Sequence, residues 1–439
     1  MDFDGRLTRR RWLSSLAAAT GSIAGCAAPL GDGTSADSDA PSSDSDPTTR
    51  AGGAGDDSAW PTFRGDDRNT GCALNDHAPA DYPERKWTVS IGDGVWSSPV
   101  VADGRLYIGS MDYKVYAIDA ATGEIDWTYE TDGPVQSTPT VADGRVYVGS
   151  FDKHVYCLDA ETGTKQWSHE TAGLVNSSPT VDDSRVYIGS GVIGVGEVHS
   201  YLESSGVEPE GGGLYALNRE TGALEWRRYP TYRISSTPAV VDSTVYIGLT
   251  DGEPNRPLIA ALDASSGDAE WEFETNNAAI TSPSVQSGRV YCATFFGTVH
   301  ALSTETGEEA WGFNIGDGDI RGSTAVCDGS VYVPASGNKL GERSDNPVLY
   351  SLSVDGDVQW EHEIPGARQM GSSPAVTSDA IYVGTHFRNG GGGMYAVSHA
   401  GERLWGREVE DGEGVGSSPA VDDGTLYYGA DNGIVYALE

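Results

Sequence analysis

The sequence is dominated by a repeat with a period near 40 residues, and its clearest copy runs from Ser97 to Trp127. This copy contains four short runs rich in Val, Ile, Tyr and Trp, which are separated by Asp-Gly, Ser-x-Asp and Thr-Gly turns. Short β-branched and aromatic runs with such turns predict four antiparallel strands joined by hairpins. A lone four-stranded sheet cannot cover both of its faces, so neighbouring copies must bury each other, as in a propeller or a solenoid.

Two markers count the copies, because a Ser/Thr-Pro pair begins each copy and a tryptophan closes it. The first marker occurs at Pro99, Pro139, Pro179, Pro238, Pro283, Pro374 and Pro419, with Gly322-Ser323-Thr324 as a member that has lost its proline. The closing tryptophans that follow are Trp127, Trp167, Trp226, Trp271, Trp311, Trp360 and Trp405. Eight first strands and seven closing strands leave the last copy without its fourth strand.

The missing strand precedes the first copy, at residues 85–91 around Trp87. A strand from the N-terminal side that completes the last blade closes the sheets into a ring without open edges. The sequence therefore predicts an all-β, eight-bladed propeller of four-stranded antiparallel blades, with its blades at residues 92–439. Residues 59–84 are interpreted as a cap that packs against the ring.

The closing tryptophan occupies an equivalent place in every blade when the clasp strand is included. The set is Trp87, Trp127, Trp167, Trp226, Trp271, Trp311, Trp360 and Trp405. A large aromatic side chain repeated at a fixed place is a core residue by default, so we interpret these indoles as structural docking groups between blades. A set of aromatic ligand platforms is the less favoured alternative. The glycine of the Thr-Gly pair is expected to supply a positive φ in its turn.

The string Ala117-x-Asp119-x-x-Thr122-Gly123-x-x-x-Trp127 resembles the tryptophan-docking motif of pyrroloquinoline-quinone (PQQ) repeats. The resemblance covers the chain from Trp60 to Glu439. It implies the eight-bladed fold of the quinoprotein alcohol dehydrogenases and of non-enzymatic relatives, such as the bacterial lipoprotein that assists outer-membrane barrel assembly. Because function lies in sites carried by a fold, the resemblance leaves the activity open.

The first 58 residues predict export and anchoring. The string Thr8-Arg9-Arg10-Arg11-Trp12-Leu13 resembles a twin-arginine motif, and a short apolar run follows it. Ile23-Ala24-Gly25-Cys26 resembles a lipobox, so residues 1–25 are interpreted as a signal peptide and Cys26 as the lipidated residue; ordinary cleavage with an incidental Cys26 is the alternative. Residues 26–58 are expected to form a disordered tether, because they carry few apolar side chains. We therefore expect anchoring to the outer face of the cytoplasmic membrane.

The formal net charge is −37, from 65 acidic and 28 basic residues. The acidic residues are spread through every blade, which favours adaptation of the whole surface to molar salt over a local cation-binding surface. Together with twin-arginine export of a lipoprotein, this charge suggests a haloarchaeal protein. Nucleic acid is not an expected partner, because its phosphates require a basic stripe.

Candidate binding residues lie on one rim of the predicted ring. Insertions between the second and third strands gather there, at residues 192–213, 251–257, 335–347 and 386–393. On the same side, the residue three places before each Ser/Thr-Pro proline varies, whereas its predecessor is apolar in every copy. The variable position includes Trp96, Gln136, Asn176 and Arg321, which we interpret as a polar and aromatic channel mouth. Unselected variation at a solvated position is the alternative.

Catalytic equipment is not visible in the sequence. In the resembling dehydrogenases a ring formed by two adjacent cysteines clamps the quinone, and this chain has no Cys-Cys pair. Its eight histidines are scattered, and Asp112, Asp152 and Asp431 are interpreted as hairpin residues rather than calcium ligands. Cys157 and Cys292 are expected to be small buried residues, and the spacing of Cys72 does not predict a disulfide partner.

We therefore predict a monomeric, non-catalytic module with no metal and no cofactor, which binds a protein partner or a surface polymer at the inserted rim. One alternative is a PQQ- and calcium-dependent quinoprotein dehydrogenase. The other is a propeller that binds surface polysaccharide or serves as a sensor.

Overall fold

The computed structural model describes residues 60–191, 211–250, 256–275, 281–316, 318–339, 342–343, 346–367, 369–385, 392–409 and 413–439. These residues belong to one compact unit, Arg50–Glu439. The predicted signal peptide, Cys26 and the predicted tether lie outside the described residues, as do parts of the four insertions. In the part of the chain that is described, no helix is long and apolar enough to cross a membrane.

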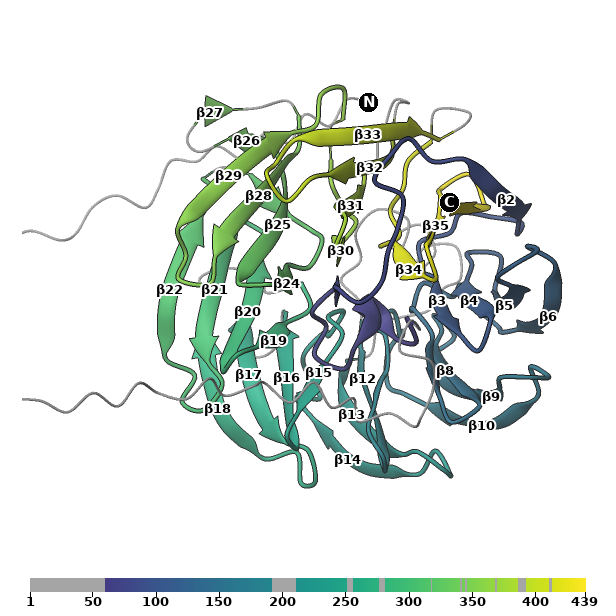
Figure 1. The fold of residues 1–439 in the computed structure, drawn as a ribbon. Helices are drawn as coiled ribbons and strands as arrows, with labels where there is room; N and C mark the ends of the chain where they lie inside the picture. Colours follow the sequence, from purple (N-terminus) through teal and green to yellow (C-terminus); the bar gives the residue numbers. More distant parts are fainter. Residues whose placement is uncertain are drawn as a thin grey trace, which may run out of the picture. The chain divides into compact units, whose positions relative to one another are not determined.

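Eight blades of antiparallel strands are arranged around a central axis in the described part of the chain (Figure 1). Blade 1 consists of β3 (Val100–Ala102), β4 (Arg105–Gly109), β5 (Lys114–Asp119) and β6 (Ile125–Glu130). Blade 2 consists of β7 (Thr140–Ala142), β8 (Arg145–Gly149), β9 (His154–Asp159) and β10 (Lys165–Glu170). Blade 3 consists of β11 (Thr180–Val181), β12 (Arg185–Ser190), β13 (Gly213–Asn218) and β14 (Leu224–Arg228). In each blade the first strand is innermost, so successive strands lead outward.

The next three blades follow the same order. Blade 4 consists of β15 (Ala239–Val241), β16 (Thr244–Leu249), β17 (Leu258–Asp263) and β18 (Ala269–Glu274). Blade 5 consists of β19 (Ser284–Gln286), β20 (Arg289–Thr294), β21 (Thr298–Ser303) and β22 (Glu309–Asn314). Blade 6 consists of β24 (Ala325–Cys327), β25 (Ser330–Ser336), β28 (Val348–Ser353) and β29 (Val358–Glu363), and β23 (Asp319–Ile320) also pairs with β25. A separate small hairpin is formed by β26 (Asn338–Lys339) and β27 (Glu342–Arg343).

The last two blades contain the strands that come from the N-terminal side. Blade 7 consists of β30 (Ala375–Thr377), β31 (Ile381–Gly384), β32 (Gly393–Val397) and β33 (Arg403–Glu408), and β1 (Cys72–Ala73) pairs with β30 in parallel. Blade 8 consists of β34 (Ala420–Asp422), β35 (Thr425–Gly429), β36 (Ile434–Leu438) and β2 (Arg85–Ser90). Strand β2 is antiparallel to β36, with Thr88 opposite Tyr436. The predicted eight-bladed, all-β propeller and its closure by an N-terminal strand are confirmed.

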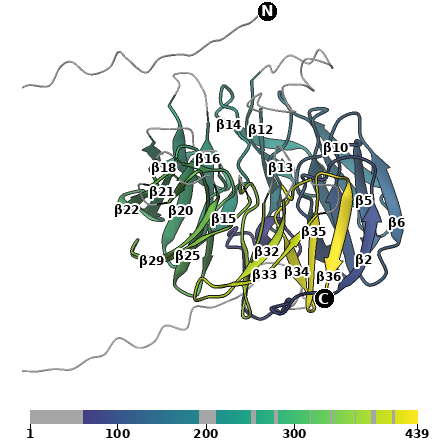
Figure 2. The ribbon, with the colours of Figure 1, turned by 90° about the horizontal axis from the view of Figure 1, so that it is seen from above.

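The hydrophobic core lies between blades, which Figure 2 shows from the side. One cluster joins Leu106 and Ile118 of blade 1 to Tyr427 and Val435 of blade 8. Another joins Tyr246 of blade 4 to blade 5. Because each sheet buries its faces against its neighbours, apolar burial stabilises the closed ring more than any single blade.

Eight tryptophans of the outermost strands connect each blade to the next. Each indole Nε1–H donates to a backbone carbonyl at 2.8–3.0 Å. In seven blades the acceptor lies in the turn between the third and fourth strands of the next blade. Trp405 is the exception, because β36 and β2 are not joined by a hairpin, and Pro79 before β2 supplies the carbonyl at 2.8 Å. The described tryptophans thus join neighbouring blades all around the ring.

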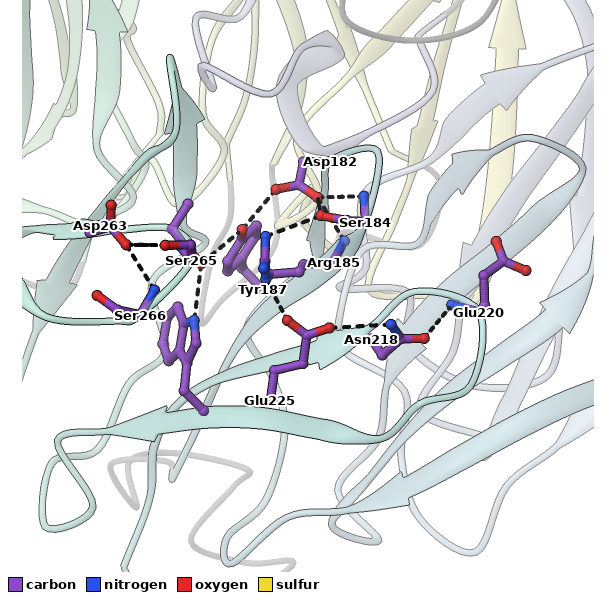
Figure 3. A network of polar contacts seen from close by, with 12 residues as sticks. Asp182, Ser184, Arg185, Tyr187, Asn218, Glu220, Glu225, Asp263, Ser265 and Ser266 are labelled. Carbon is purple, nitrogen blue, oxygen red and sulfur yellow. Dashed lines mark hydrogen bonds and ion pairs between the residues drawn. The ribbon is translucent and has the colours of Figure 1, made fainter.

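An aspartate or asparagine holds the acceptor turn in shape in the two blades that Figure 3 shows, with Asn218 in blade 3 and Asp263 in blade 4. Asp263 Oδ1 accepts from the backbone N–H groups of Ser265 at 3.0 Å and Ser266 at 2.8 Å. The Ala264 carbonyl in this turn accepts from Trp226 Nε1 at 2.9 Å. The Asx-turn therefore orients the carbonyl that the neighbouring indole needs.

Two turns of blade 2 contain glycines with a positive φ, and only one of these glycines also lies against an indole. Gly163 has φ +69, and a Cβ on it would lie 2.6 Å from Cε3 of Trp127. Gly144, in the same blade, has φ +70, but a Cβ there would meet nothing within 4 Å. The two positions share the backbone conformation and differ in the space beside them.

We therefore expect Gly163→Ala to destabilise the protein more than Gly144→Ala. Both substitutions strain a left-handed backbone by about 1–2 kcal/mol, whereas only Gly163→Ala also displaces an indole, which adds about 1–3 kcal/mol. Equilibrium unfolding in guanidinium chloride measures the two losses. Equal losses would show that the indole contact does not restrict this glycine.

Candidate functional site

The central channel has two different ends. The segments that lead into the innermost strands, together with the hairpins between second and third strands, lie at one end, which we name the mouth. The other end carries the hairpins between first and second strands. Residues 60–73, named the leader, lie at the centre of the ring in Figure 1 and cross the channel. The leader and the mouth therefore define the site that the fold builds on its axis.

The leader contacts the innermost strands of six blades in order around the ring. In each, a valine N–H donates to a leader carbonyl at 2.7–2.9 Å. The pairs are Val101 with Trp60, Val141 with Pro61, Val240 with Asp67, Val285 with Arg68, Val326 with Thr70 and Val376 with Gly71. These N–H groups lie on sheet edges that face the channel, so the leader satisfies donors that the blades cannot pair themselves.

A disulfide attaches the leader to the ring. Cys72 of the leader is bonded to Cys327 in the innermost strand of blade 6, across a sequence separation of 255 residues. A bridge that closes so long a loop restricts the unfolded chain strongly. The spacing of the cysteines did not predict this pair. The prediction that Cys157 and Cys292 are buried is confirmed, and both are free thiols.

A ring of eight side-chain hydroxyls lines the channel between the mouth and the leader, and we name it the hydroxyl ring. Its members are Ser98, Thr138, Ser178, Thr237, Ser282, Ser323, Ser373 and Ser418. Each hydroxyl accepts the backbone N–H of the equivalent residue in the preceding blade at 2.9–3.4 Å. The donor to Ser98 is Ser418, so the hydrogen bonds close on themselves. Each member is 3–8% exposed, which shows that open space reaches the hydroxyl ring.

Three of the predicted mouth residues lie half-buried above the hydroxyl ring. Trp96 lies beside blade 8, where a Cβ on Gly416 would be 3.8 Å from its Cδ1 atom. Gln136 Oε1 and Asn176 Oδ1 are buried and have no hydrogen-bond partner in the described part of the chain. Polar atoms of this kind are available to a ligand or to water.

The fourth predicted residue, Arg321, is exposed and is engaged elsewhere. Its guanidinium lies 4.9 Å from the ring centroid of Phe295 and 3.6 Å from Asp319 Oδ2. The Gln369 amide lies against the same guanidinium. The contacts with Phe295 and Asp319 are to residues of blade 5 and of the segment before blade 6, and the grouping of Arg321 with Trp96 at one mouth stays a prediction. The floor of the mouth is the hydroxyl ring, which the recurring Ser/Thr before proline could have indicated.

The leader places charged groups below the hydroxyl ring. Burial lowers the pKa of Arg64 to about 9, and the nearby Asp66 partly offsets this. The pKa of Asp67 is raised to about 7, mainly by burial and also by the charges of Asp66 and Asp182, while Arg219 and Arg68 oppose the shift. The axis therefore holds ionisable groups whose charge depends on their surroundings.

The comparisons with known proteins agree with this geometry. A PQQ-repeat family model, described as outer membrane protein assembly factor BamB, matches residues 79–209, 206–285 and 255–439. The chain belongs to this family. The resemblance that the docking motif indicated is thus confirmed.

Curated relatives of this chain have different activities. Tetrathionate hydrolase of Acidithiobacillus ferrooxidans is 25% identical over 193 residues, covering 38% of this chain and 37% of the relative. The outer membrane protein assembly factor BamB of Yersinia pestis is 26% identical over 191 residues, covering 38% of this chain and 45% of the relative. Each match spans less than half of the relative's length.

Solved structures share the fold at low sequence identity. The quinohemoprotein alcohol dehydrogenase of Comamonas testosteroni superposes with a TM-score of 0.69 and 17% identity, covering 87% of this chain and 80% of that chain. BamB from Moraxella catarrhalis superposes with a TM-score of 0.60 and 16% identity, covering 82% of this chain and 98% of that chain. Similarity at this level shows the fold and leaves the activity open.

The described residues do not fit the quinone clamp of the resembling dehydrogenases. That clamp needs adjacent cysteines at the quinone, whereas Cys72 and Cys327 are bonded at the level of the leader, on the far side of the hydroxyl ring from the mouth. No three His, Cys, Asp or Glu side chains are grouped as metal ligands among the residues described. Trp96 offers a planar surface at the mouth, but no described contact joins it to a carboxylate set.

We expect the stability of the protein to fall as the pH rises from about 4 to about 7 through Asp67. Its pKa is raised from 3.8 to about 7 by folding, so in this window the folded state binds more protons than the unfolded state. Melting temperatures at fixed salt should fall less steeply across this window in Asp67→Asn than in the unchanged protein. Identical slopes in both proteins would contradict the raised pKa.

Proposed function

We propose that this protein is an exported, lipid-anchored propeller that binds a protein partner at the mouth face and is not an enzyme. The twin-arginine string, the lipobox at Cys26 and the polar tether support export and anchoring at the outer face of the cytoplasmic membrane. The net charge of −37 supports the adaptation of this protein to concentrated salt. Relatives named as outer membrane protein assembly factors support a protein partner, although the membrane in that name is not carried over to this chain.

Exposed aromatic side chains on the mouth face carry this proposal. Tyr113 is 41% exposed and Phe296 is 55% exposed, and both lie in hairpins between the second and third strands. Arg321 stacks on Phe295, the neighbour of Phe296, so an arginine and aromatic rings occur together at this end. Aromatic and arginine side chains are enriched in protein interfaces, because they bury much area and still form directed polar contacts.

Site-specific photocrosslinking on intact cells tests the proposed surface. A photoreactive residue at position 296 or 113 should give a discrete adduct with another protein. The matched controls are Ile125, which is 43% exposed, and Leu224, which is 48% exposed; both lie at the start of fourth strands, at the other end of the ring. Adducts at the control positions alone would place the binding surface on the opposite face and contradict the proposal.

The dehydrogenase alternative has its own test, which is motivated by the superposition on a quinohemoprotein alcohol dehydrogenase. We expect PQQ to leave the tryptophan fluorescence of the folded protein unchanged in molar KCl, with or without calcium. We also expect no dye-coupled oxidation of alcohols. Calcium-dependent quenching accompanied by turnover would overturn the non-catalytic proposal and would make Trp96 and Asn176 candidates for the quinone site.

A further inference from the structure

A buried arginine lies in the leader with most of its donors unused. Arg64 is 2% exposed, and Nη2 donates to the Thr70 carbonyl at 3.1 Å. Nε and Nη1 are buried and have no partner among the described residues. Arg64 also has φ +64, a conformation that a side-chain-bearing residue rarely adopts. A strained residue with a buried, unpaired cation indicates that the surroundings hold it there for a purpose other than local packing.

No described carboxylate accepts from this guanidinium. The nearest acid, Asp66, uses Oδ1 for the backbone N–H groups of Arg68 at 3.1 Å and Thr70 at 2.9 Å. Its Oδ2 accepts from the Thr70 hydroxyl. Asp66 therefore acts on Arg64 through space, and the N–H groups on Nε and Nη1 still need an acceptor.

The guanidinium lies beside the innermost segment of blade 7, next to one member of the hydroxyl ring. Arg64 Nη2 and the Pro374 carbonyl lie 2.6 and 2.8 Å from the place that a Cβ on Gly71 would occupy. Pro374 follows Ser373, a member of the hydroxyl ring. Asn69 lies at the same level, where its Nδ2 donates to the carbonyls of Pro238 at 3.0 Å and Pro283 at 3.2 Å. The leader thus brings the cation up to the underside of the hydroxyl ring.

The hydroxyl ring adds donors of its own. Each of its oxygens accepts one backbone N–H, and its own proton has no acceptor among the residues that the structure describes. The hydroxyl ring and Arg64 therefore both carry donors that have no acceptor among the described residues. Hydrogen bonds to an ion are about twice as strong as neutral ones, and a low-dielectric channel strengthens them further.

We propose that the propeller axis binds a small inorganic anion, such as chloride, between the Arg64 guanidinium and the hydroxyl ring. A small ion suits this place because Arg64 and Asn69 are 2% and 1% exposed, so a large ligand could not reach the guanidinium from solvent. Asp66 lowers the affinity by repulsion, so the site fills at high anion concentration. The bound anion neutralises the buried cation and joins the leader to the hydroxyl ring. This inference does not depend on the proposed partner or on the absence of catalysis.

Anomalous diffraction with bromide tests the site directly. Crystals of the full chain grown in NaBr should show an anomalous peak within hydrogen-bond distance of Arg64 Nε or Nη1, below the hydroxyl ring. Bromide replaces chloride readily and is identified by its absorption edge, whereas water gives no signal. Peaks at the surface alone, with water beside Arg64, would overturn the proposal.

A thermal test in solution separates the anion from general salt effects. At equal sodium concentration, the melting temperature should be higher in chloride than in glutamate, and the difference should grow with the logarithm of chloride concentration. Arg64→Gln should abolish the difference. The matched control Arg68→Gln, in the same leader, should retain it. If Arg64→Gln does not fold, the bromide peak in the unchanged protein still decides, and a chloride effect of equal size in a folded Arg64→Gln would contradict the site.

Discussion

The unpaired inner edges of eight β-sheets are the constraint on which this structure depends. A propeller closes its ring by joining the first and last blades, but every innermost strand still turns one row of backbone donors toward the channel. Two devices satisfy these donors here. The hydroxyl ring accepts one N–H from each blade, and leader carbonyls accept another from six of them. The need to pair the backbone N–H groups of the innermost strands thus determines which residues occupy the axis.

The leader that covers the edges also determines the chemistry of the channel. Its backbone makes the edge contacts, and the same segment carries Arg64, Asp66 and Asp67 into buried surroundings. Their pKa values are shifted mainly because burial disfavours the charged forms. The disulfide from Cys72 to Cys327 keeps this charged segment attached to blade 6. A structural cap and a potential binding site are therefore the same segment.

The family relationship explains why the fold alone does not reveal the activity. Relatives with the names of a hydrolase and an assembly factor, and structures of dehydrogenases, share the ring. Such proteins differ in their loops and in a few side chains at the mouth. The blades hold these loops in place but do not determine which residues the loops contain. In this chain the mouth combines Trp96, two half-buried amides and exposed aromatic hairpins above a floor of hydroxyls.

The sequence by itself determined the number of blades, the clasp strand and the position of the docking tryptophans. These follow from local patterns that recur in register, such as Ser/Thr-Pro at one end of a copy and Thr-Gly-x-x-x-Trp at the other. Only the tertiary structure showed that Arg321 turns toward Phe295 and Asp319. It also decided that Cys72 meets Cys327, and that Arg64 lies beside Pro374, next to one member of the hydroxyl ring. These contacts join residues far apart in sequence and depend on how the ring closes, so no repeat pattern encodes them.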